Sequence, residues 1–159
     1  EIWTRPAVRA RDDMVSTEPH SGTDGGTRTV TAPGDDAPHI LIVDDAATVR
    51  LFHRQILEAA AYAVDEAVNG IEALEKALQS PFDLYVVDVN MPKLDGYGFL
   101  RELRSRDIPQ VPAIMVSTEA AADDQKLAYA SGANAYLIKP SKPEKLLLHV
   151  RLLIGGADT

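Results

Sequence analysis

The chain has 159 residues and a formal net charge of −8 at pH 7, and it contains no cysteine. The lack of cysteine excludes disulfides, thiol catalysis and cysteine metal sites. The acidic balance argues against nucleic acid as the main ligand, because phosphate contacts require a surplus of Lys and Arg on one face. No apolar run approaches the ~18–20 residues of a membrane helix, and no signal-like segment is present. We therefore expect no membrane partner and a cytoplasmic location.

The first 38 residues differ in composition from the rest of the chain. Residues 1–38 have almost no apolar periodicity and contain Gly- and Pro-rich stretches, so they cannot bury enough apolar surface to offset the entropy lost on ordering. We predict a disordered N-terminal extension there. One interpretation makes Met14 the native start, preceded by vector-derived residues, and the alternative is a functional tail. A folded domain is predicted over 39–155, followed by a short tail over 156–159.

From His39 on, short β-branched runs alternate with helical patterns, which is typical of βα units and a parallel sheet. The continuous apolar run 40–43 predicts a strand that is buried on both faces. A helix is predicted over 47–60. Its apolar stripe consists of Val49, Phe52 and Ile56.

The next elements follow the same alternation. A weaker strand is predicted over 63–67, and a helix opens at Asn69–Gly70 and ends at Ser80–Pro81. A third strand is predicted over 84–87 and a third helix over 96–106.

The last elements are a strand over 113–116, a helix over 119–131, a strand over 135–138 and a helix over 143–154 that stops at Gly155. Five strands and five helices in strict alternation predict an α/β fold with a doubly wound open sheet.

Polar residues stand at the ends of four of the five predicted strands. They are Asp44 and Asp45 after the first, Asp88 after the third, Ser117 and Thr118 after the fourth, and Lys139 after the fifth. Ligands of doubly wound sheets bind outside the carboxyl ends of the strands, where the strand order reverses. If the order is 2-1-3-4-5, these four strands lie side by side and their end groups converge.

Three carboxylates at close quarters repel one another unless a cation neutralises them. Mg²⁺ is the expected cation, since it binds a few carboxylates in octahedral oxygen coordination and keeps positions for water or phosphate oxygens. One carboxylate can then act as a nucleophile toward phosphorus. Lys139 and the Ser117 hydroxyl could hold the other phosphoryl oxygens.

Each of these signals also has a simpler interpretation. Asp44–Asp45 could be a solvated turn or a helix cap. Asp88 before Asn–Met–Pro could have no role beyond starting a turn. Ser117–Thr118 could cap the following helix, and Lys139 could be a surface lysine. The conjunction of four strand ends, in the right chain order and on the same rim, favours one shared site.

Four segments resemble a known family in order and separation. They are ILIVDD (40–45), VVDVNMPKLDG (86–96), IMVSTEA (114–120) and AYLIKP (135–140). Through them, residues 38–154 resemble the receiver domain of two-component response regulators, most closely the single-domain chemotaxis type. The resemblance implies a flavodoxin-like (βα)5 fold with strand order 2-1-3-4-5.

The resemblance also implies a role for each residue of the site. Asp88 would be the phosphoacceptor. Ser117 matches the hydroxyl that rotates toward the phosphoryl group, and Lys139 matches the lysine that pairs with it. The implied Mg²⁺ ligands are the Asp45 and Asp88 carboxylates and the backbone carbonyl of Asn90, with Asp44 assisting through water.

Tyr136 matches the aromatic residue whose ring turns inward when the hydroxyl moves, which would reshape the face of the fourth helix, fifth strand and fifth helix. The alternative is a tyrosine that keeps one rotamer. Asn90, Thr118 and Glu119 stand where the family tunes hydrolysis of the acyl phosphate. Asn90 and Glu119 match the chemotaxis regulators, so we expect a short-lived phosphoryl state. Thr118 replaces a smaller residue, which would narrow access to the site.

The implied function is a signalling switch that takes a phosphoryl group from a histidine kinase or a phosphotransfer protein onto Asp88 and then binds a downstream protein. With no output-domain pattern after residue 154, the effect is expected to pass through protein contacts or onward phosphotransfer in a phosphorelay. The last helix has more leucines than one core stripe needs. This indicates either a partner or homodimer face or a broad core contact.

Two other functions compete with this one. A Mg²⁺-dependent phosphohydrolase of the haloacid dehalogenase type also forms an aspartyl phosphate, but that class places its nucleophile on the first strand with a second Asp two residues later. Here Asp44 and Asp45 are adjacent and Asp88 follows the third strand. The other competitor is an interaction module with a vestigial acidic site. The leading interpretation predicts no enzymatic turnover beyond self-phosphorylation and self-dephosphorylation.

Overall fold

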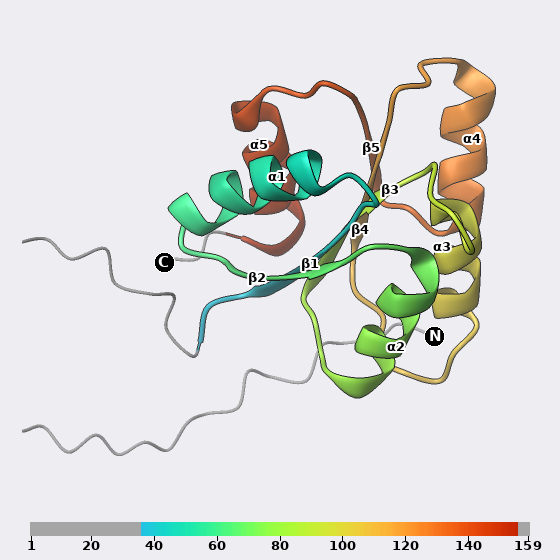
Figure 1. The fold of residues 1–159 in the computed structure, drawn as a ribbon, viewed down its shortest axis with the longest axis horizontal. Coiled ribbons are helices and arrows are strands. Elements are labelled where there is room, and N and C mark those ends of the chain that lie inside the picture. Colours follow the sequence, from blue (N-terminus) through green and yellow to red (C-terminus); the bar gives the residue numbers. More distant parts are fainter. Residues whose placement is uncertain (1–35, 156–159) are drawn as a thin grey trace, which may run out of the picture.

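The computed structural model describes residues 36–155, so the predicted N-terminal extension lies almost wholly outside the described residues, as does the tail over 156–159. Strands and helices alternate along the described chain (Figure 1). The strands are β1 (His39–Val43), β2 (Ala63–Ala67), β3 (Leu84–Asp88), β4 (Ala113–Ser117) and β5 (Ala135–Ile138). The helices are α1 (Ala47–Ala59), α2 (Gly70–Gln79), α3 (Gly96–Arg104), α4 (Ala122–Ser131) and α5 (Pro143–Ile154).

The strands form one parallel five-stranded sheet in the order β2-β1-β3-β4-β5. Because parallel neighbours cannot be joined by a tight turn, each connection carries a helix across the sheet. The order reverses between β1 and β3, which makes the carboxyl ends of these two strands the switch point. The predicted α/β fold class and strand order are confirmed.

The helices cover both faces of the sheet. In Figure 1, α1 and α5 lie on one face, and α2, α3 and α4 lie on the other. Side chains alternate along each strand, so Ile40 and Ile42 pack in the core beneath α1 and α5, whereas Leu41 and Val43 pack in the core beneath the other three helices. This double burial explains why the strands read as continuous apolar runs.

The apolar stripe predicted for α1 is wrong in one respect. The helix buries His53 and Leu57, whereas Phe52 remains 43% exposed, and Ile56 only lines the edge of the core. Apolar residues are spread around much of this helix, so periodicity alone could not choose the buried arc. The position of α1 over the sheet and beside α5 decides it.

The fourth helix begins three residues later than predicted, at Ala122 instead of Glu119. The main chain of Glu119 is held by other partners: its N–H donates to the Ser117 hydroxyl and its carbonyl accepts from the Tyr136 hydroxyl. These bonds keep the segment after β4 out of the helix. The third helix ends at Arg104, two residues earlier than predicted.

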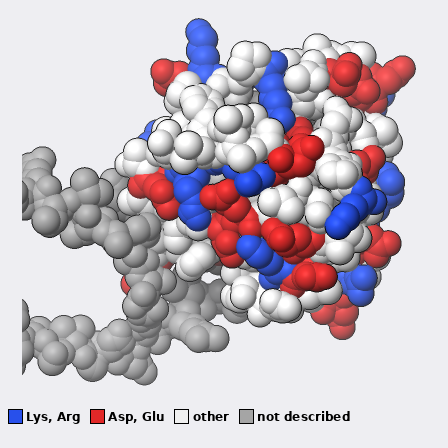
Figure 2. All heavy atoms as spheres, viewed as in Figure 1, with Lys and Arg blue, Asp and Glu red and all other residues white. Residues whose placement is uncertain are grey.

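The edge strand β2 carries two acidic residues, and each is paired with a base from a flanking helix. Glu66 accepts from Arg50 and Arg54 of α1, both at 2.8 Å, and Asp65 accepts from Lys76 of α2 at 3.2 Å. Figure 2 shows acidic side chains adjoining basic ones over the face in view. Charged side chains on an edge strand discourage pairing with another sheet.

Within residues 36–155, no helix is long and apolar enough to cross a membrane.

Candidate functional site

The carboxyl ends of four adjacent strands form the site. Asp44 directly follows β1, Asp88 and Ser117 are the last residues of β3 and β4, and Lys139 directly follows β5. The register pairs Val43 with Val87, so the residues at the strand ends lie at similar heights. The convergence predicted from the strand ends is therefore what the structure shows, and β2 contributes no polar group at its end.

Lys139 joins two of the carboxylates. Its Nζ donates to Asp88 Oδ1 at 2.8 Å and to Asp44 Oδ2 at 3.0 Å. Asp44 and Asp88 are almost fully buried, at 2% and 6% exposure, which makes these charge-assisted bonds stronger than they would be in water. Lys139 is thus a site residue and not a free surface lysine.

Asp45 completes an acidic cluster with Asp44 and Asp88. One carboxylate oxygen from each of the three lies within 4.8 Å of the others, and Asp45 is the member exposed to solvent. Three oxygen donors, one of them open to water, fit a hard divalent cation such as Mg²⁺ that keeps part of its hydration shell. Asn90 lies two residues beyond Asp88 on the exposed β3–α3 loop.

The ionisation of the site reflects burial and the ion pairs. Burial raises the pKa of Asp88, and the charges of Asp44 and Asp45 raise it further, while the hydrogen bond from Lys139 opposes the rise. Burial alone would lower the pKa of Lys139, but its bonds to Asp88 and Asp44 outweigh that effect and raise it. The lysine stays protonated at neutral pH, and an added cation would favour the charged form of Asp88.

Arg50 is a supporting residue that sequence reasoning missed. Its Nη1 donates to the Asp44 carbonyl at 2.7 Å, while its Nε binds Glu66 of β2. The arginine therefore fixes the main chain of Asp44 from α1. The sequence shows an arginine six residues after Asp44, which could have suggested this contact. Which group the arginine binds, however, depends on how α1 is placed over the sheet.

The β3–α3 loop folds tightly against the nucleophile candidate. The Gly96 N–H donates to the Val89 carbonyl at 2.9 Å, and Asp95 caps α3 by accepting from the Gly98 N–H at 2.7 Å. A Cβ on Gly96 would overlap the Asp88 carbonyl oxygen. Sequence reasoning treated Gly96 only as a helix start. In the structure, any side chain at this position would collide with the backbone of Asp88.

Ser117, Glu119 and Tyr136 form a linked group beside the cluster. The buried Ser117 Oγ accepts from the Glu119 N–H at 3.0 Å, and the Tyr136 hydroxyl donates to the Glu119 carbonyl at 2.6 Å. Tyr136 is half-buried against the core beneath α3 and α4. The predicted site residues Thr118 and Glu119 are exposed around this group. The connection through the main chain of Glu119 was not predicted.

The fold and the site together define a flavodoxin-like protein with an acidic, lysine-bridged site at its switch point. The sequence model of the response regulator receiver domain matches residues 40–151, which is more than half of the chain. The chain therefore belongs to the response regulator receiver domain family.

Similar sequences come from longer proteins. The transcriptional regulatory protein ResD of Bacillus subtilis is 36% identical over 119 residues, which cover 75% of this chain and 49% of ResD. The sensor protein EvgS of Escherichia coli is 36% identical over 114 residues, which cover 72% of this chain and 9% of EvgS. The chain thus spans about half the length of the first of these relatives and a small part of the second.

Similar solved structures cover about three quarters of this chain. The chemotaxis protein CheY4 of Vibrio cholerae is 34% identical, with a TM-score of 0.70 over 74% of this chain and 98% of that one. The receiver domain of the sensor histidine kinase PA1611 of Pseudomonas aeruginosa is 30% identical, with a TM-score of 0.70 over 76% of this chain and 99% of that one. The latter structure has a magnesium ion coordinated in its active-site cleft.

Proposed function

We propose that this chain is a phosphorylation-dependent signalling switch that accepts a phosphoryl group on Asp88 from a histidine kinase or a phosphotransfer protein. The observation that carries the proposal is the contact of Lys139 with both Asp88 and Asp44, within a cluster of three carboxylates. Membership of the receiver domain family supports it. The chain's own chemistry would be limited to gaining and losing this phosphoryl group.

In the proposed transfer, an Asp88 oxygen attacks phosphorus, a P–O bond forms, and the P–N bond to the donor imidazole breaks as the imidazole takes up a proton. Asp44, Asp45, Asp88 and the Asn90 carbonyl would hold Mg²⁺, which neutralises the carboxylates and the phosphoryl oxygens. Lys139 starts in contact with Asp88 and can follow a phosphoryl oxygen at the same position. It stabilises charge that the transfer brings into a buried site.

Ser117 would carry the signal away from the phosphoryl group. If its hydroxyl rotates to donate to a phosphoryl oxygen, the Glu119 N–H loses its acceptor. The carbonyl of the same residue accepts from the Tyr136 hydroxyl, so a movement of Glu119 would also alter the bond to Tyr136. The shared use of Glu119 supports the proposed switching of Tyr136 over a tyrosine that keeps one rotamer.

The face that reads this change would be formed by α4, β5 and α5. These three elements carry large apolar side chains that are exposed: Leu127, Tyr129, Ile138, Leu148 and Leu152. Leu152 is the most exposed of them, at 73%. Leu147 packs against the core, so the leucine surplus of α5 divides into a core part and a surface part. We propose that the surface part binds a downstream protein or a second copy of the chain.

Other features of the function also stay predictions. Asn90, Thr118 and Glu119 are exposed around the site, where they would set the access of water and give a short-lived phosphoryl group. Chemotaxis is supported by a similar chemotaxis protein, while a transcriptional regulator is similar too. The domain limits, 39–155, and the cytoplasmic location rest on the sequence.

The proposal is tested by incubating the protein with Mg²⁺ and acetyl phosphate and measuring intact mass. Wild type is expected to gain one phosphoryl group that hydroxylamine removes, as an acyl phosphate requires, and Asp88→Asn is expected to gain none. Asp107→Asn, which changes an exposed aspartate of the α3–β4 loop, is the matched control and should behave as wild type. Equal phosphorylation of Asp88→Asn and wild type would contradict the proposed phosphoacceptor.

A further inference from the structure

The two ends of α4 are held in very different ways. The helix buries only Ala128 and Ser131, both in its carboxyl-terminal half. Its N-cap residue, Ala121, offers no side-chain cap, and the residues from Thr118 to Asp123 are exposed. Little apolar contact therefore fixes the amino end in place.

The carboxyl end of α4 is closed by a compact set of bonds. Gly132, at φ +117°, donates its N–H to the Tyr129 carbonyl at 3.1 Å, and the Ala133 N–H donates to the Ala128 carbonyl at 3.0 Å. The Ser131 hydroxyl donates to the Leu127 carbonyl at 2.8 Å. Two carbonyls of the last turn, those of Ala128 and Tyr129, thus accept hydrogen bonds from residues beyond the helix.

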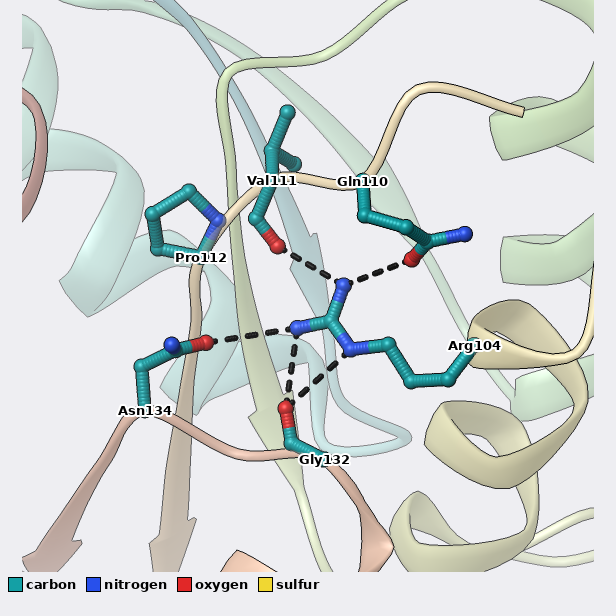
Figure 3. A pocket seen from close by; sticks show the side chains of 6 residues that line it. All are labelled: Arg104, Gln110, Val111, Pro112, Gly132 and Asn134. Atoms are coloured by element: carbon teal, nitrogen blue, oxygen red, sulfur yellow. Dashed lines mark hydrogen bonds between the residues drawn. The ribbon is translucent and has the colours of Figure 1, made fainter. Parts of the chain in front are cut away.

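Arg104, the last residue of α3, holds this end of α4 to the rest of the domain (Figure 3). Its Nε and Nη2 both donate to the Gly132 carbonyl, at 3.1 and 2.9 Å. The remaining donors reach Gln110 Oε1 and the Val111 carbonyl, both at 2.8 Å, and Asn134 Oδ1 at 3.3 Å. All five N–H groups of the guanidinium are therefore used, each on a neutral oxygen.

Figure 3 shows the guanidinium between the segment before β4 and the turn between α4 and β5. Together with the other residues drawn there, Arg104 lines a surface pocket of about 340 Å³. Asn134 also accepts from the Ala113 N–H at 2.9 Å, so the same turn is tied to the first residue of β4. A Cβ on Gly132 would lie 2.7 Å from Arg104 Cγ, so the arginine also needs a glycine there.

Within residues 36–155, the comparable link near the amino end of α4 is the main chain of Glu119. That link runs to Ser117 and Tyr136, the residues whose bonds change in the proposed function. One end of α4 is thus tied to the phosphorylation site, and the other is tied to Arg104 at the opposite rim of the sheet.

We propose that Arg104 is a positioning residue that fixes the carboxyl end of α4, so that phosphorylation of Asp88 moves the helix at its amino end about this fixed point. This inference rests on the proposed function. It adds the direction of the response: the surface near Ala122 changes, while the turn at Gly132 stays in place.

Arg104→Lys is the informative variant, because it keeps the positive charge but replaces a planar fork of five donors by three donors on one atom. Lysine cannot reach all four acceptor groups in the same plane, so the turn at Gly132 should loosen. Gln110→Ala is a second variant. It leaves Arg104 in place and removes one acceptor of the guanidinium, together with the bonds that Gln110 Nε2 donates to the carbonyls of Leu103, Arg106 and Ile108. Arg106→Lys is the matched control, since Arg106 is exposed and pairs only with Glu102 at 3.5 Å among the ion pairs of the described residues.

The test is amide hydrogen exchange resolved by NMR, with and without Mg²⁺ and excess acetyl phosphate, with intact mass measured on the same samples. In phosphorylated wild type, exchange should rise severalfold at amides 122–125 and stay unchanged at 129–133. In Arg104→Lys, exchange at 129–133 should rise roughly tenfold before phosphorylation, and phosphorylation should then affect the whole helix. Gln110→Ala should show a smaller rise at the same amides, and Arg106→Lys should match wild type.

Each other outcome is informative. If phosphorylated wild type exchanges equally fast at both ends of α4, or if Arg104→Lys and Gln110→Ala leave amides 129–133 at the wild-type rate, the role of Arg104 is overturned and the proposed function stands. If wild type gains no phosphoryl mass, the proposed function fails and the inference fails with it. The mass measurement separates the two cases.

Discussion

Lys139 neutralises part of the negative charge of the carboxylate cluster. Its ammonium contacts Asp44 and Asp88, and both carboxylates are nearly closed to solvent. Removing one partner of such a buried pair leaves an uncompensated charge, which costs about 3–5 kcal/mol. The lysine therefore allows two carboxylates to lie close together. One lysine does not neutralise three carboxylates, so the cluster keeps a net negative charge that a divalent cation could neutralise.

His53 is a second buried ionisable residue near this site, and it has no evident part in the proposed chemistry. Its ring is 4% exposed, and within the described residues its Nδ1 has no hydrogen-bond partner. Burial lowers the pKa of His53 from 6.5, Asp44 opposes this shift, and Lys139 adds to it. The unfolded chain therefore binds a proton at His53 more readily than the folded chain does. As far as this group is concerned, the free energy of unfolding is highest above pH 6.5 and decreases as the pH drops through that value.

His53→Leu should raise the free energy of unfolding by about 1–3 kcal/mol at pH 7, because it removes an unpaired buried polar atom. It should also flatten the loss of stability between pH 7 and pH 5. Urea unfolding at several pH values measures both effects. His149→Leu is the control, since the His149 Nδ1 already has the Lys145 carbonyl as a partner. A less stable His53→Leu protein with an unchanged acid limb would contradict this account.

At the scale of elements, the β3–α3 loop packs closely against the start of α3. Gly96 lies against the backbone at the end of β3, since an added Cβ would overlap the Asp88 carbonyl oxygen and lie 3.0 Å from Val89 Cα. Backbone cannot move aside as a flexible side chain can. The geometry of Asp88 therefore depends on a residue of α3 that has no side chain.

Gly96→Ala should destabilise the domain by about 1–3 kcal/mol and slow phosphorylation by acetyl phosphate, because it displaces the main chain of Asp88. The comparison is Gly98→Ala, whose Cβ would meet a terminal methyl of Leu94 at 2.6 Å, an atom that can move. We expect Gly98→Ala to phosphorylate close to the wild-type rate. Thermal unfolding and intact-mass time courses measure both effects, and a wild-type rate for Gly96→Ala would refute the dependence.

At the scale of the whole molecule, the site links elements that are distant in sequence. The three carboxylates, the lysine and the serine lie at or just after the carboxyl ends of β1, β3, β4 and β5, so the site exists only when the sheet is formed. A cation that binds this cluster binds the native state and not the unfolded chain. It must therefore raise the stability of the whole domain by RT ln(1 + [L]/Kd).

Mg²⁺ at ten times its Kd should therefore raise the free energy of unfolding by about 1.4 kcal/mol. Asp45→Asn should abolish this rise, because it removes the exposed carboxylate of the cluster. Glu75→Gln, which alters an exposed carboxylate on α2, should keep it. Thermal unfolding over a Mg²⁺ titration measures the shift, and an equal shift in Asp45→Asn and wild type would rule out a cation at this cluster.

The sequence by itself determined the alternation of strands and helices and the polar residues at the strand ends. Both follow from local patterns: doubly buried strands read as apolar runs, and polar groups mark where strands leave the core. Asp44, Asp88, Ser117 and Lys139 could therefore be found without coordinates. Their assigned roles came from a family resemblance.

Only the tertiary structure decided which distant groups meet. It buried His53 in place of Phe52, aimed Arg50 at the Asp44 carbonyl, and placed Arg104 on the turn at Gly132. These contacts depend on how each helix sits on the sheet, which periodicity within one helix does not specify. The start of α4 was misplaced for the same reason, because Glu119 is held by partners from β4 and β5 and not by its own helix.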